Sequence, residues 1–244
     1  YYEQAANQNN PDGLFYLGMH YLSGQGTNSD FQKARLYFEL SAKQNHPKAL
    51  FQLGYLFMNG LGVEKDLTKA RQFLELSARR NNPEAFLYLG LMNLDGVGVE
   101  KNYNKARQLF EMAAAQNNST ACVYLGLMYS NAQGVERNYP KAIEYYKRAA
   151  AQNNPTAFVN LGNMFLNGVG VTQNYEKAFE FYELAAKLND AAGLLCLGHA
   201  YANGYGVGRD YHKARQYYEM SASQNNSDAL LKLGILYFNG FGVE

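Results

Sequence analysis

Residues 47–82 read PKALFQLGYLFMNGLGVEKDLTKARQFLELSARRNN, and variants of this stretch return along the whole chain at a step of 36 residues without insertions. Leu-Gly begins at positions 17, 53, 89, 125, 161, 197 and 233, and Lys-Ala begins at positions 33, 69, 105, 141, 177 and 213. A fixed period of this length is typical of solenoid proteins. We therefore expect residues 1–244 to form a single repeat array, belonging to a longer protein. Its parts are a partial repeat 1–10, six whole repeats (11–46, 47–82, 83–118, 119–154, 155–190, 191–226) and a partial repeat 227–244.

Each repeat holds two segments whose apolar residues have helical spacing, as repeat three shows. In its first segment, about residues 83–94, one side carries Ala85, Phe86, Leu89 and Met92. In its second segment, about residues 103–116, one side carries Ala106, Leu109, Phe110, Ala113 and Ala114. This spacing favours amphipathic helices. A glycine recurs beside the first set in every repeat although it costs about 1 kcal/mol in a helix, which indicates close helix packing. The sequence predicts an all-α fold of helix-turn-helix repeats.

Asparagine and aspartate mark the expected ends of these helices. An asparagine follows each second helix, where the backbone commonly turns through the left-handed region: Asn45, Asn81, Asn117, Asn153, Asn189 and Asn225. The next residue is a good N-cap in every repeat except the first, which has His46. Six further residues are placed to cap the second helices: Asp30, Asp66, Asn102, Asn138, Asn174 and Asp210.

The Gly-x-Gly-Val turn between the two helices resembles a phosphate-binding loop. The glycine pair recurs at 24/26, 60/62, 96/98, 168/170, 204/206 and 240/242, and repeat four has Ala132 before Gly134. A nucleotide site needs one such loop, after a strand and with a Gly-Lys-Ser/Thr ending. Here the motif follows a predicted helix and lacks that ending. We interpret it as a connector whose glycines supply positive backbone angles.

Composition narrows the possible partners. The 22 basic and 21 acidic residues leave a formal charge of +1 without any block of like charge, so nothing favours binding to nucleic acid. No apolar run approaches the ~18 residues of a membrane helix, so we expect no direct membrane insertion. Cys122 and Cys196 lie far apart and without a histidine cluster, which favours free thiols over a disulfide framework or a zinc site. We expect no metal and no cofactor.

The repeat pattern resembles the Sel1-like (Sel-one-like) repeat, a relative of the tetratricopeptide repeat, over the whole chain. Repeat two carries the motif most completely: Ala49, Leu53, Gly54, Phe57, Gly60, Gly62, Val63, Asp66, Lys69, Ala70, Phe73, Ser77 and Ala78. Departures are Thr27 for valine in repeat one, Ala132 for glycine, and asparagine where the family commonly has glycine after the second helix. The resemblance implies a right-handed α/α superhelical solenoid whose first helices line a concave surface. It also implies a scaffold or adaptor that holds other proteins together.

If the first helices face inward, the residues opposite their packing side form rows along the concave surface. We predict that these rows bind a protein or peptide partner through the following residues: Phe15, Tyr16, Met19, Phe51, Tyr55, Leu87, Tyr88, Leu91, Tyr124, Leu127, Asn160, Asn163, His199 and Ile235. Met and aromatic anchors suit such a groove. Alternatively, tightly wound repeats bury much of this stripe against neighbouring helices. The middle row, which includes Tyr55, Leu91 and Asn163, decides between the two by its exposure.

Two other functions remain as alternatives to a scaffold with a groove. The array could be a structural spacer or a self-assembling arm without a groove ligand, because its uncapped ends leave apolar faces that another copy could cover. A penicillin-binding hydrolase, a function linked with a cysteine-rich relative, has less support because Ser-x-x-Lys, Ser-Asp-Asn and Lys-Thr-Gly are absent. The four histidines form no common site, so we expect a protein that is not an enzyme.

Overall fold

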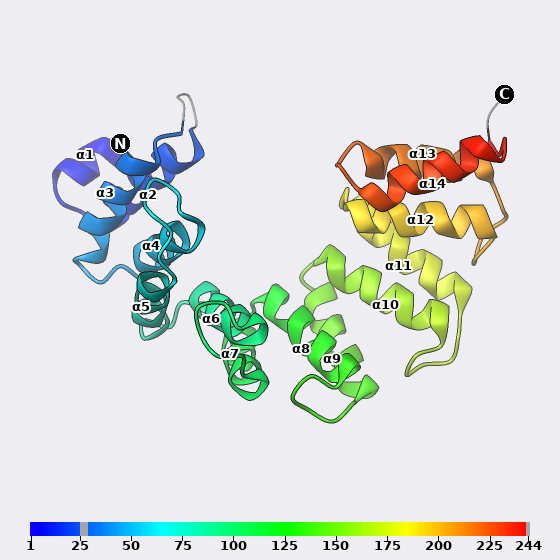
Figure 1. Ribbon diagram of the computed structural model, residues 1–244, viewed down its shortest axis with the longest axis horizontal. Helices are drawn as coiled ribbons and strands as arrows, with labels where there is room; N and C mark the ends of the chain where they lie inside the picture. Colours follow the sequence, from blue (N-terminus) through cyan, green and yellow to red (C-terminus); the bar gives the residue numbers. More distant parts are fainter. Residues whose placement is uncertain (25–28, 243–244) are drawn as a thin grey trace. The chain divides into compact units, whose positions relative to one another are not determined.

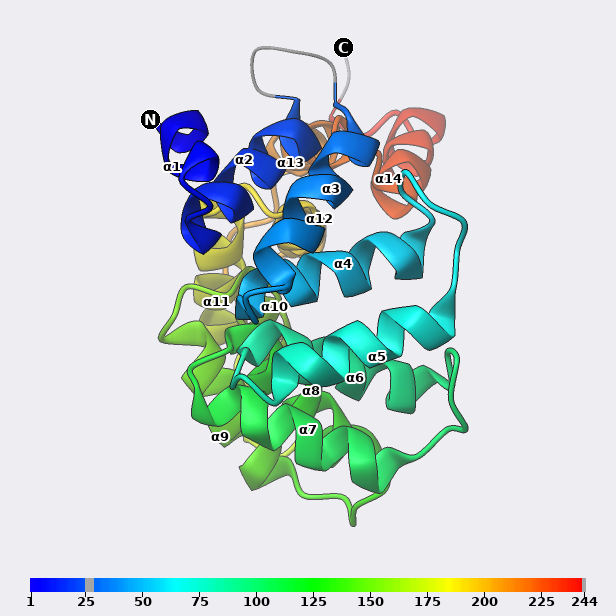
Figure 2. The ribbon, with the colours of Figure 1, turned by 90° about the vertical axis from the view of Figure 1, so that its left-hand side faces the viewer.

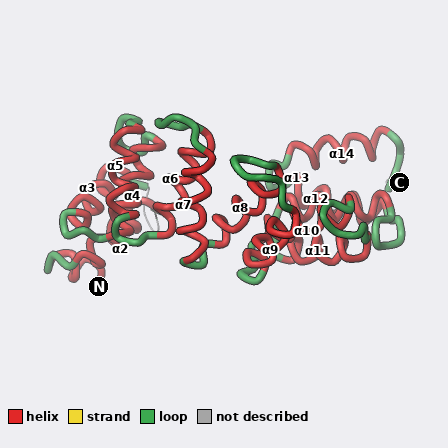
Figure 3. Tube along the Cα trace, turned by 90° about the horizontal axis from the view of Figure 1, so that it is seen from below, coloured by secondary structure: helices red, strands yellow, loops and turns green. Residues whose placement is uncertain are grey.

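In the computed structural model of the protein, the described residues are 1–24 and 29–242. Across them the chain forms helices joined by loops and turns, without any strand (Figures 1 and 3). The helices are α1 (Tyr2–Asn7), α2 (Pro11–Ser23), α3 (Phe31–Ala42), α4 (Pro47–Asn59), α5 (Leu67–Ala78), α6 (Pro83–Asp95), α7 (Tyr103–Ala115), α8 (Ser119–Asn131), α9 (Tyr139–Ala150), α10 (Pro155–Asn167), α11 (Tyr175–Lys187), α12 (Ala191–Asn203), α13 (Tyr211–Ala222) and α14 (Ser227–Phe238). The predicted all-α fold is confirmed.

Each repeat is a helix pair. Helices α2 and α3 form repeat one, and the pairing continues to α12 and α13 in repeat six; α14 is the first helix of the next repeat (Figures 1 and 2). In repeat three, the expected helices 83–94 and 103–116 differ from the observed Pro83–Asp95 and Tyr103–Ala115 by one residue at their ends. The period in the sequence is therefore the period of the structure.

The chain divides into two compact units, residues 1–121 (the N-terminal unit) and residues 122–244 (the C-terminal unit). In the N-terminal unit the pairs stack in chain order, with α3 against α4 and α5 against α6. In the C-terminal unit α9 packs on α10, α11 on α12 and α13 on α14. Each unit is an all-α repeat solenoid, in which a helix pair buries its apolar face against the next pair.

The glycine inside each first helix lets the second helix approach closely. A Cβ atom on Gly90 would lie 2.5 Å from Cε1 of Phe110, so any larger residue would displace the ring. The same relation joins Gly18 to Phe38, Gly54 to Leu74, Gly126 to Tyr146, Gly162 to Tyr182 and Gly198 to Tyr218. All six large side chains are buried. The close packing predicted from the recurring glycine is confirmed.

The asparagine turns also have the predicted geometry. Each of the following residues has a positive φ between 56° and 63°: Asn9, Asn45, Asn81, Asn117, Asn153, Asn189 and Asn225. The predicted caps of the second helices are confirmed as well; Asp66, for example, accepts hydrogen bonds from the backbone N–H groups of Thr68 and Lys69. Because each cap satisfies N–H groups that have no partner within the helix, these turns set where every helix begins.

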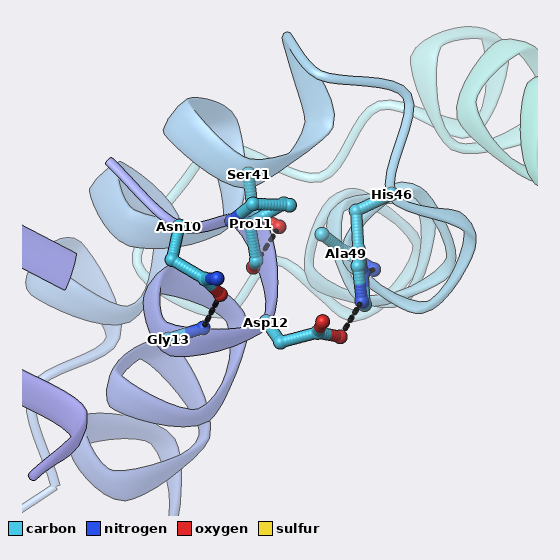
Figure 4. Close-up of polar contacts among 7 residues, drawn as sticks. All are labelled: Asn10, Pro11, Asp12, Gly13, Ser41, His46 and Ala49. Carbon is cyan, nitrogen blue, oxygen red and sulfur yellow. Dashed lines mark hydrogen bonds and ion pairs between the residues drawn. The ribbon is translucent and has the colours of Figure 1, made fainter. Parts of the chain in front are cut away.

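Repeat one ends in a cap that sequence reasoning treated as an exception. His46 also caps its helix: Nδ1 accepts a hydrogen bond of 3.1 Å from the backbone N–H of Ala49 (Figure 4). The other ring nitrogen, Nε2, lies 3.1 Å from Oδ1 of Asp12 in the preceding first helix. Since Nδ1 is the acceptor, Nε2 carries the proton and donates to the carboxylate. In the same junction the Ser41 hydroxyl donates to the Pro11 carbonyl at 2.7 Å (Figure 4).

The glycine loops are connectors, as predicted. Gly60, Gly96, Gly168 and Gly204 end their helices in the left-handed conformation, with φ between 67° and 76°. The second glycine of the pair packs closely against the second helix of the preceding repeat. A Cβ atom on Gly98, for example, would lie only 2.8 Å from Cβ of Leu67. Ala132 adopts the same conformation at φ 57°. Gly26 and Thr27 lie outside the described residues.

Candidate functional site

The predicted binding residues all lie on the first helices, and most are half-buried. We call the side of the first helices that carries them the first-helix surface. Met19, Tyr55 and Leu91 of the middle row are half-buried in the N-terminal unit. In the C-terminal unit, Leu127, Asn163 and His199 are half-buried, while Ile235 is 44% exposed. The middle row therefore keeps part of each side chain in contact with solvent.

In the N-terminal unit, three of the predicted residues form one aromatic cluster. The ring of Phe51 lies 5.1 Å from that of Tyr88 at an interplanar angle of 77°. The ring of Tyr55 lies 6.0 Å from that of Tyr88 at 76°. Both contacts are edge-to-face, the arrangement that aromatic quadrupoles favour. Because Tyr88 is on α6 and the other two are on α4, this cluster joins the first helices of successive repeats.

Other predicted residues of this unit lie at the edge of the surface or beneath it. Phe15 and Leu87 are only 6% and 7% exposed, and Phe15 belongs to the core around Phe38 and Leu53. Tyr16 is 42% exposed and stacks on Tyr2 of α1, with 4.9 Å between the ring centroids. Phe15 and Leu87 therefore support the first-helix surface from below, and Tyr16 lies on it.

In the C-terminal unit, three predicted residues from two repeats line one depression of about 200 Å³. Leu127 comes from α8, while Asn160 and Asn163 come from α10. Tyr146 and Met164, both buried, also line it. The depression therefore combines apolar side chains with four asparagines, of which Asn160 and Asn163 stand one helical turn apart and so lie side by side on the helix.

Hydrogen bonds fix which polar atoms these two asparagines present. The Tyr182 hydroxyl donates to Oδ1 of Asn163 at 2.7 Å. The Asn160 amide nitrogen donates to the Thr156 carbonyl at 2.8 Å. Because each carboxamide uses one end in this way, Asn163 keeps N–H donors and Asn160 keeps a carbonyl acceptor for a ligand. One donor and one acceptor side by side match the N–H and C=O groups of a peptide backbone.

His199, next in the middle row, has the environment of a neutral side chain. Burial is the main cause that lowers its pKa, and the nearby Lys232 ammonium lowers it further. Its ring lies edge-on to that of Tyr218, with centroids 5.7 Å apart. Nε2 is buried without a hydrogen-bond partner among the described residues. The Asp228 carboxylate acts in the opposite direction and raises the pKa, but its effect is smaller than that of burial.

The described residues hold no group of three or more histidine, cysteine, aspartate or glutamate side chains that could bind a metal ion. Cys122 and Cys196 are free thiols, and burial raises the pKa of both, that of Cys196 to about 12. Within residues 1–24 and 29–242, every helix is too short or too polar to cross a bilayer.

Comparison with known families identifies the repeat. The Sel1 repeat model matches residues 1–10, 11–46, 47–82, 83–118, 119–154, 159–190, 192–226 and 227–244. The chain belongs to the Sel1 repeat family. Proteins with Sel1 repeats typically mediate protein–protein interactions and are generally non-enzymatic scaffolds. No curated protein sequence matches the chain.

Solved structures agree with this assignment. A protective antigen of uropathogenic Escherichia coli that displays an SLR fold is 32% identical, with a TM-score of 0.80; the match covers 98% of this chain and 51% of the antigen. A Sel1 repeat protein from Oxalobacter formigenes is 31% identical, with a TM-score of 0.84, over 88% of this chain and 89% of that protein. An immunity protein from Pseudomonas aeruginosa shares the fold at 22% identity and a TM-score of 0.62. The chain thus spans about half of the first relative and most of the second.

Sequence analysis missed the tyrosines beneath the surface of these Sel1 repeats. Tyr146 lines the depression and shares a hydrogen bond with the Ser130 side chain, and burial raises its pKa to about 12. Tyr182 orients Asn163, and burial raises its pKa as well. A signal was present in the repeat. The residue that faces the first-helix glycine is Phe38, Leu74 or Phe110 in repeats one to three and a tyrosine in repeats four to six.

Proposed function

We propose that this chain is a non-enzymatic interaction scaffold that binds an extended segment of a partner protein along the first-helix surface. The observation that carries the proposal is the depression in the C-terminal unit, where Leu127, Asn160 and Asn163 converge from two repeats. An extended peptide offers N–H and C=O groups for the two carboxamides and side chains for the apolar wall. The aromatic cluster of the N-terminal unit offers a second contact for large apolar side chains.

The charge of the protein is consistent with this kind of partner. The formal net charge of +1 gives the chain little long-range attraction for a strongly charged ligand. Affinity then depends on apolar contact and on backbone hydrogen bonds, which act at short range. Tyrosine and asparagine serve such recognition well, because a tyrosine gives large contact area with few rotamers to lose and an asparagine both donates and accepts.

Peptides selected from a random display library against the whole chain would test the proposal, with affinities measured by calorimetry. We test four variants: Tyr55→Ala, Leu91→Ala, Leu127→Ala and Asn160→Ala. Each should lower the affinity of those peptides that bind to the unit carrying the change, by about 1–2 kcal/mol in binding free energy. Leu76→Ala and Leu184→Ala, which truncate exposed leucines on second helices, are the matched controls and leave affinity unchanged.

Unfolding by urea separates this proposal from simple burial. We expect the binding variants to stay within about 1 kcal/mol of the parent in free energy of unfolding. A loss of roughly 2–5 kcal/mol, the usual cost of truncating a core residue, combined with unchanged peptide affinity, would refute the proposal. Selected peptides that bind equally to the parent and to all four variants would refute it too.

A further inference from the structure

Five repeats carry the same aromatic stack between their two helices. A ring of the first helix stacks on a ring of the second, with centroids 5.5–5.8 Å apart: Tyr21 on Tyr37, Phe57 on Phe73, Tyr129 on Tyr145, Phe165 on Phe181 and Tyr201 on Tyr217. A lysine ammonium lies 5.1–5.4 Å from the first ring of each pair, within cation–π range: Lys33, Lys69, Lys141, Lys177 and Lys213. The stack is thus a recurring structural feature of the repeat.

Repeat three keeps the lysine and loses both rings. Asn93 and Leu109 occupy the two ring positions, and Lys105 occupies the lysine position. The Asn93 side chain is only 5% exposed, and its amide nitrogen donates to the Leu89 carbonyl of its own helix at 2.7 Å. No described residue donates to its Oδ1 atom. A short polar group therefore lies where the other five repeats have an aromatic ring that is half-buried or buried.

A pocket of about 210 Å³ opens at this place. It is lined by Asn93, Leu109 and Lys105, by Leu89 and Met92 of the core, and by Arg71 and Glu75 of α5. An apolar cavity of roughly 150 Å³ is enough to hold benzene in another protein. The volume in repeat three therefore suits one aromatic side chain.

Repeat two shows what the missing rings change. Its equivalent depression is wider, about 740 Å³, and is lined by Arg35, Phe57, Val63 and Lys69 among others. Leu53 and Leu56, the counterparts of Leu89 and Met92, are not among its lining residues. We infer that the Phe57 ring covers Leu53 and Leu56 in repeat two. In repeat three, where the ring is absent, the pocket extends to the core residues Leu89 and Met92.

We propose that the pocket of repeat three binds an aromatic side chain of a partner protein, which completes the stack that this repeat lacks. The ring would contact Leu89, Met92 and Leu109 and lie beneath the Lys105 ammonium, as the internal rings do beneath their lysines. Asn93 Oδ1 is an acceptor for the hydroxyl of a tyrosine. The pocket lies between α5 and α7, the second helices of repeats two and three, so it is distinct from the first-helix surface.

The probe for the test is p-cresol, the side chain of tyrosine, titrated into the whole chain and followed by NMR. We expect saturable binding near millimolar concentration, with nuclear Overhauser effects between the ring protons of p-cresol and the side chains of Leu89, Met92 and Leu109. The double variant Asn93→Phe/Leu109→Phe rebuilds the stack of repeat two and should weaken binding at least tenfold. Lys105→Met should weaken it several-fold, whereas Lys141→Met, at a repeat whose ring is internal, should leave it unchanged.

Two results would overturn the proposal. One is the absence of saturable p-cresol binding to the unmodified chain. The other is binding whose Overhauser effects come from residues outside the pocket. Circular dichroism establishes that the double variant is folded; if it is not, the Overhauser effects on the unmodified chain and the Lys105→Met comparison decide the matter alone.

Discussion

The two compact units share one backbone plan and differ at one buried position of each repeat. The residue that packs against the first-helix glycine is Phe38, Leu74 or Phe110 in the N-terminal unit. In the C-terminal unit it is Tyr146, Tyr182 or Tyr218. All six side chains are buried; the tyrosines differ from Phe38 and Phe110 by a hydroxyl group alone, and from Leu74 by the ring as well.

The surface above two of the three tyrosines, Tyr182 and Tyr218, is more polar as well. The middle row of the first-helix surface is Met19, Tyr55 and Leu91 in the N-terminal unit and Leu127, Asn163 and His199 in the C-terminal unit. A buried hydroxyl needs a hydrogen-bond partner, because an unsatisfied one costs about 1–3 kcal/mol. Tyr182 forms a hydrogen bond with Asn163, and Tyr146 forms one with Ser130. We infer that the core residue and the polarity of the surface above it change together.

Alkaline pH should affect the C-terminal unit most. Burial raises the pKa of Tyr146 from 10.0 to about 12 and raises those of Tyr182 and Tyr218 too. The folded protein then keeps protons that the unfolded chain loses. The stability contributed by these hydroxyls is fully present below pH 10 and is lost as the pH rises from about 10 to 12. For Tyr146 alone the loss is on the order of 2 kcal/mol.

Urea unfolding between pH 9 and 11.5, followed by circular dichroism, measures this loss. The triple variant Tyr146→Phe/Tyr182→Phe/Tyr218→Phe is the control, because its C-terminal unit resembles the N-terminal unit at these positions. We expect its stability to fall less steeply with pH than that of the parent. Equal slopes for the two proteins would show that the tyrosines do not cause the dependence.

Transferring a hydroxyl into the N-terminal unit should destabilise it. The hydroxyl of Tyr182 contacts Asn163, which lies 19 residues earlier in the chain. By the same relation, the new hydroxyl in Phe110→Tyr would face Leu91. Leu91 cannot accept a hydrogen bond, so we expect a loss of about 1–3 kcal/mol in free energy of unfolding. Adding Leu91→Asn should restore part of it. If the double variant is less stable than the sum of the single changes predicts, the proposed pairing of core and surface is wrong.

Removing a hydroxyl from the C-terminal unit should have a smaller effect. Tyr182→Phe leaves Oδ1 of Asn163 without its donor, but this asparagine is half-buried and water can replace the hydroxyl. We therefore expect a loss of about 1 kcal/mol in stability. Peptide affinity at the depression should also fall, since Asn163 is no longer held with its N–H groups outward. Unchanged affinity would show that Tyr182 does not orient the asparagine for binding.

The helices, their caps and the repeat period were predictable because each depends on local chemistry that repeats in the sequence. Asn81, for example, adopts the left-handed conformation that its side chain tolerates, and Asn82 next to it caps α6. His46 was less predictable as a cap, since an imidazole accepts a hydrogen bond only in one tautomer. Its partner Asp12 belongs to the previous first helix, 34 residues away.

The candidate site was predictable in outline only. Helical spacing placed Tyr55, Asn160 and Asn163 on the first-helix surface, where they are half-buried. It could not separate them from Phe15 and Leu87, because a residue beneath the surface has almost the same angular position as one on it. The pairing of Tyr182 with Asn163 joins two helices and depends on how closely they pack, which a single helical period does not report.

The smallest effect concerns the loop after the first helix, where one repeat of the C-terminal unit has alanine in place of glycine. Gly96 ends α6 with φ 75°, whereas Ala132 holds φ 57° at the equivalent place after α8. A residue with a Cβ atom in this conformation costs about 1–2 kcal/mol, although glycine loses more entropy on folding by about 0.4–1 kcal/mol. Ala132→Gly should therefore stabilise the protein by about 0.5–1 kcal/mol in urea unfolding. Gly168→Ala, the reverse change at φ 67° one repeat later, should destabilise the protein by a similar amount. If both changes shift the free energy of unfolding in the same direction, backbone strain is not the cause.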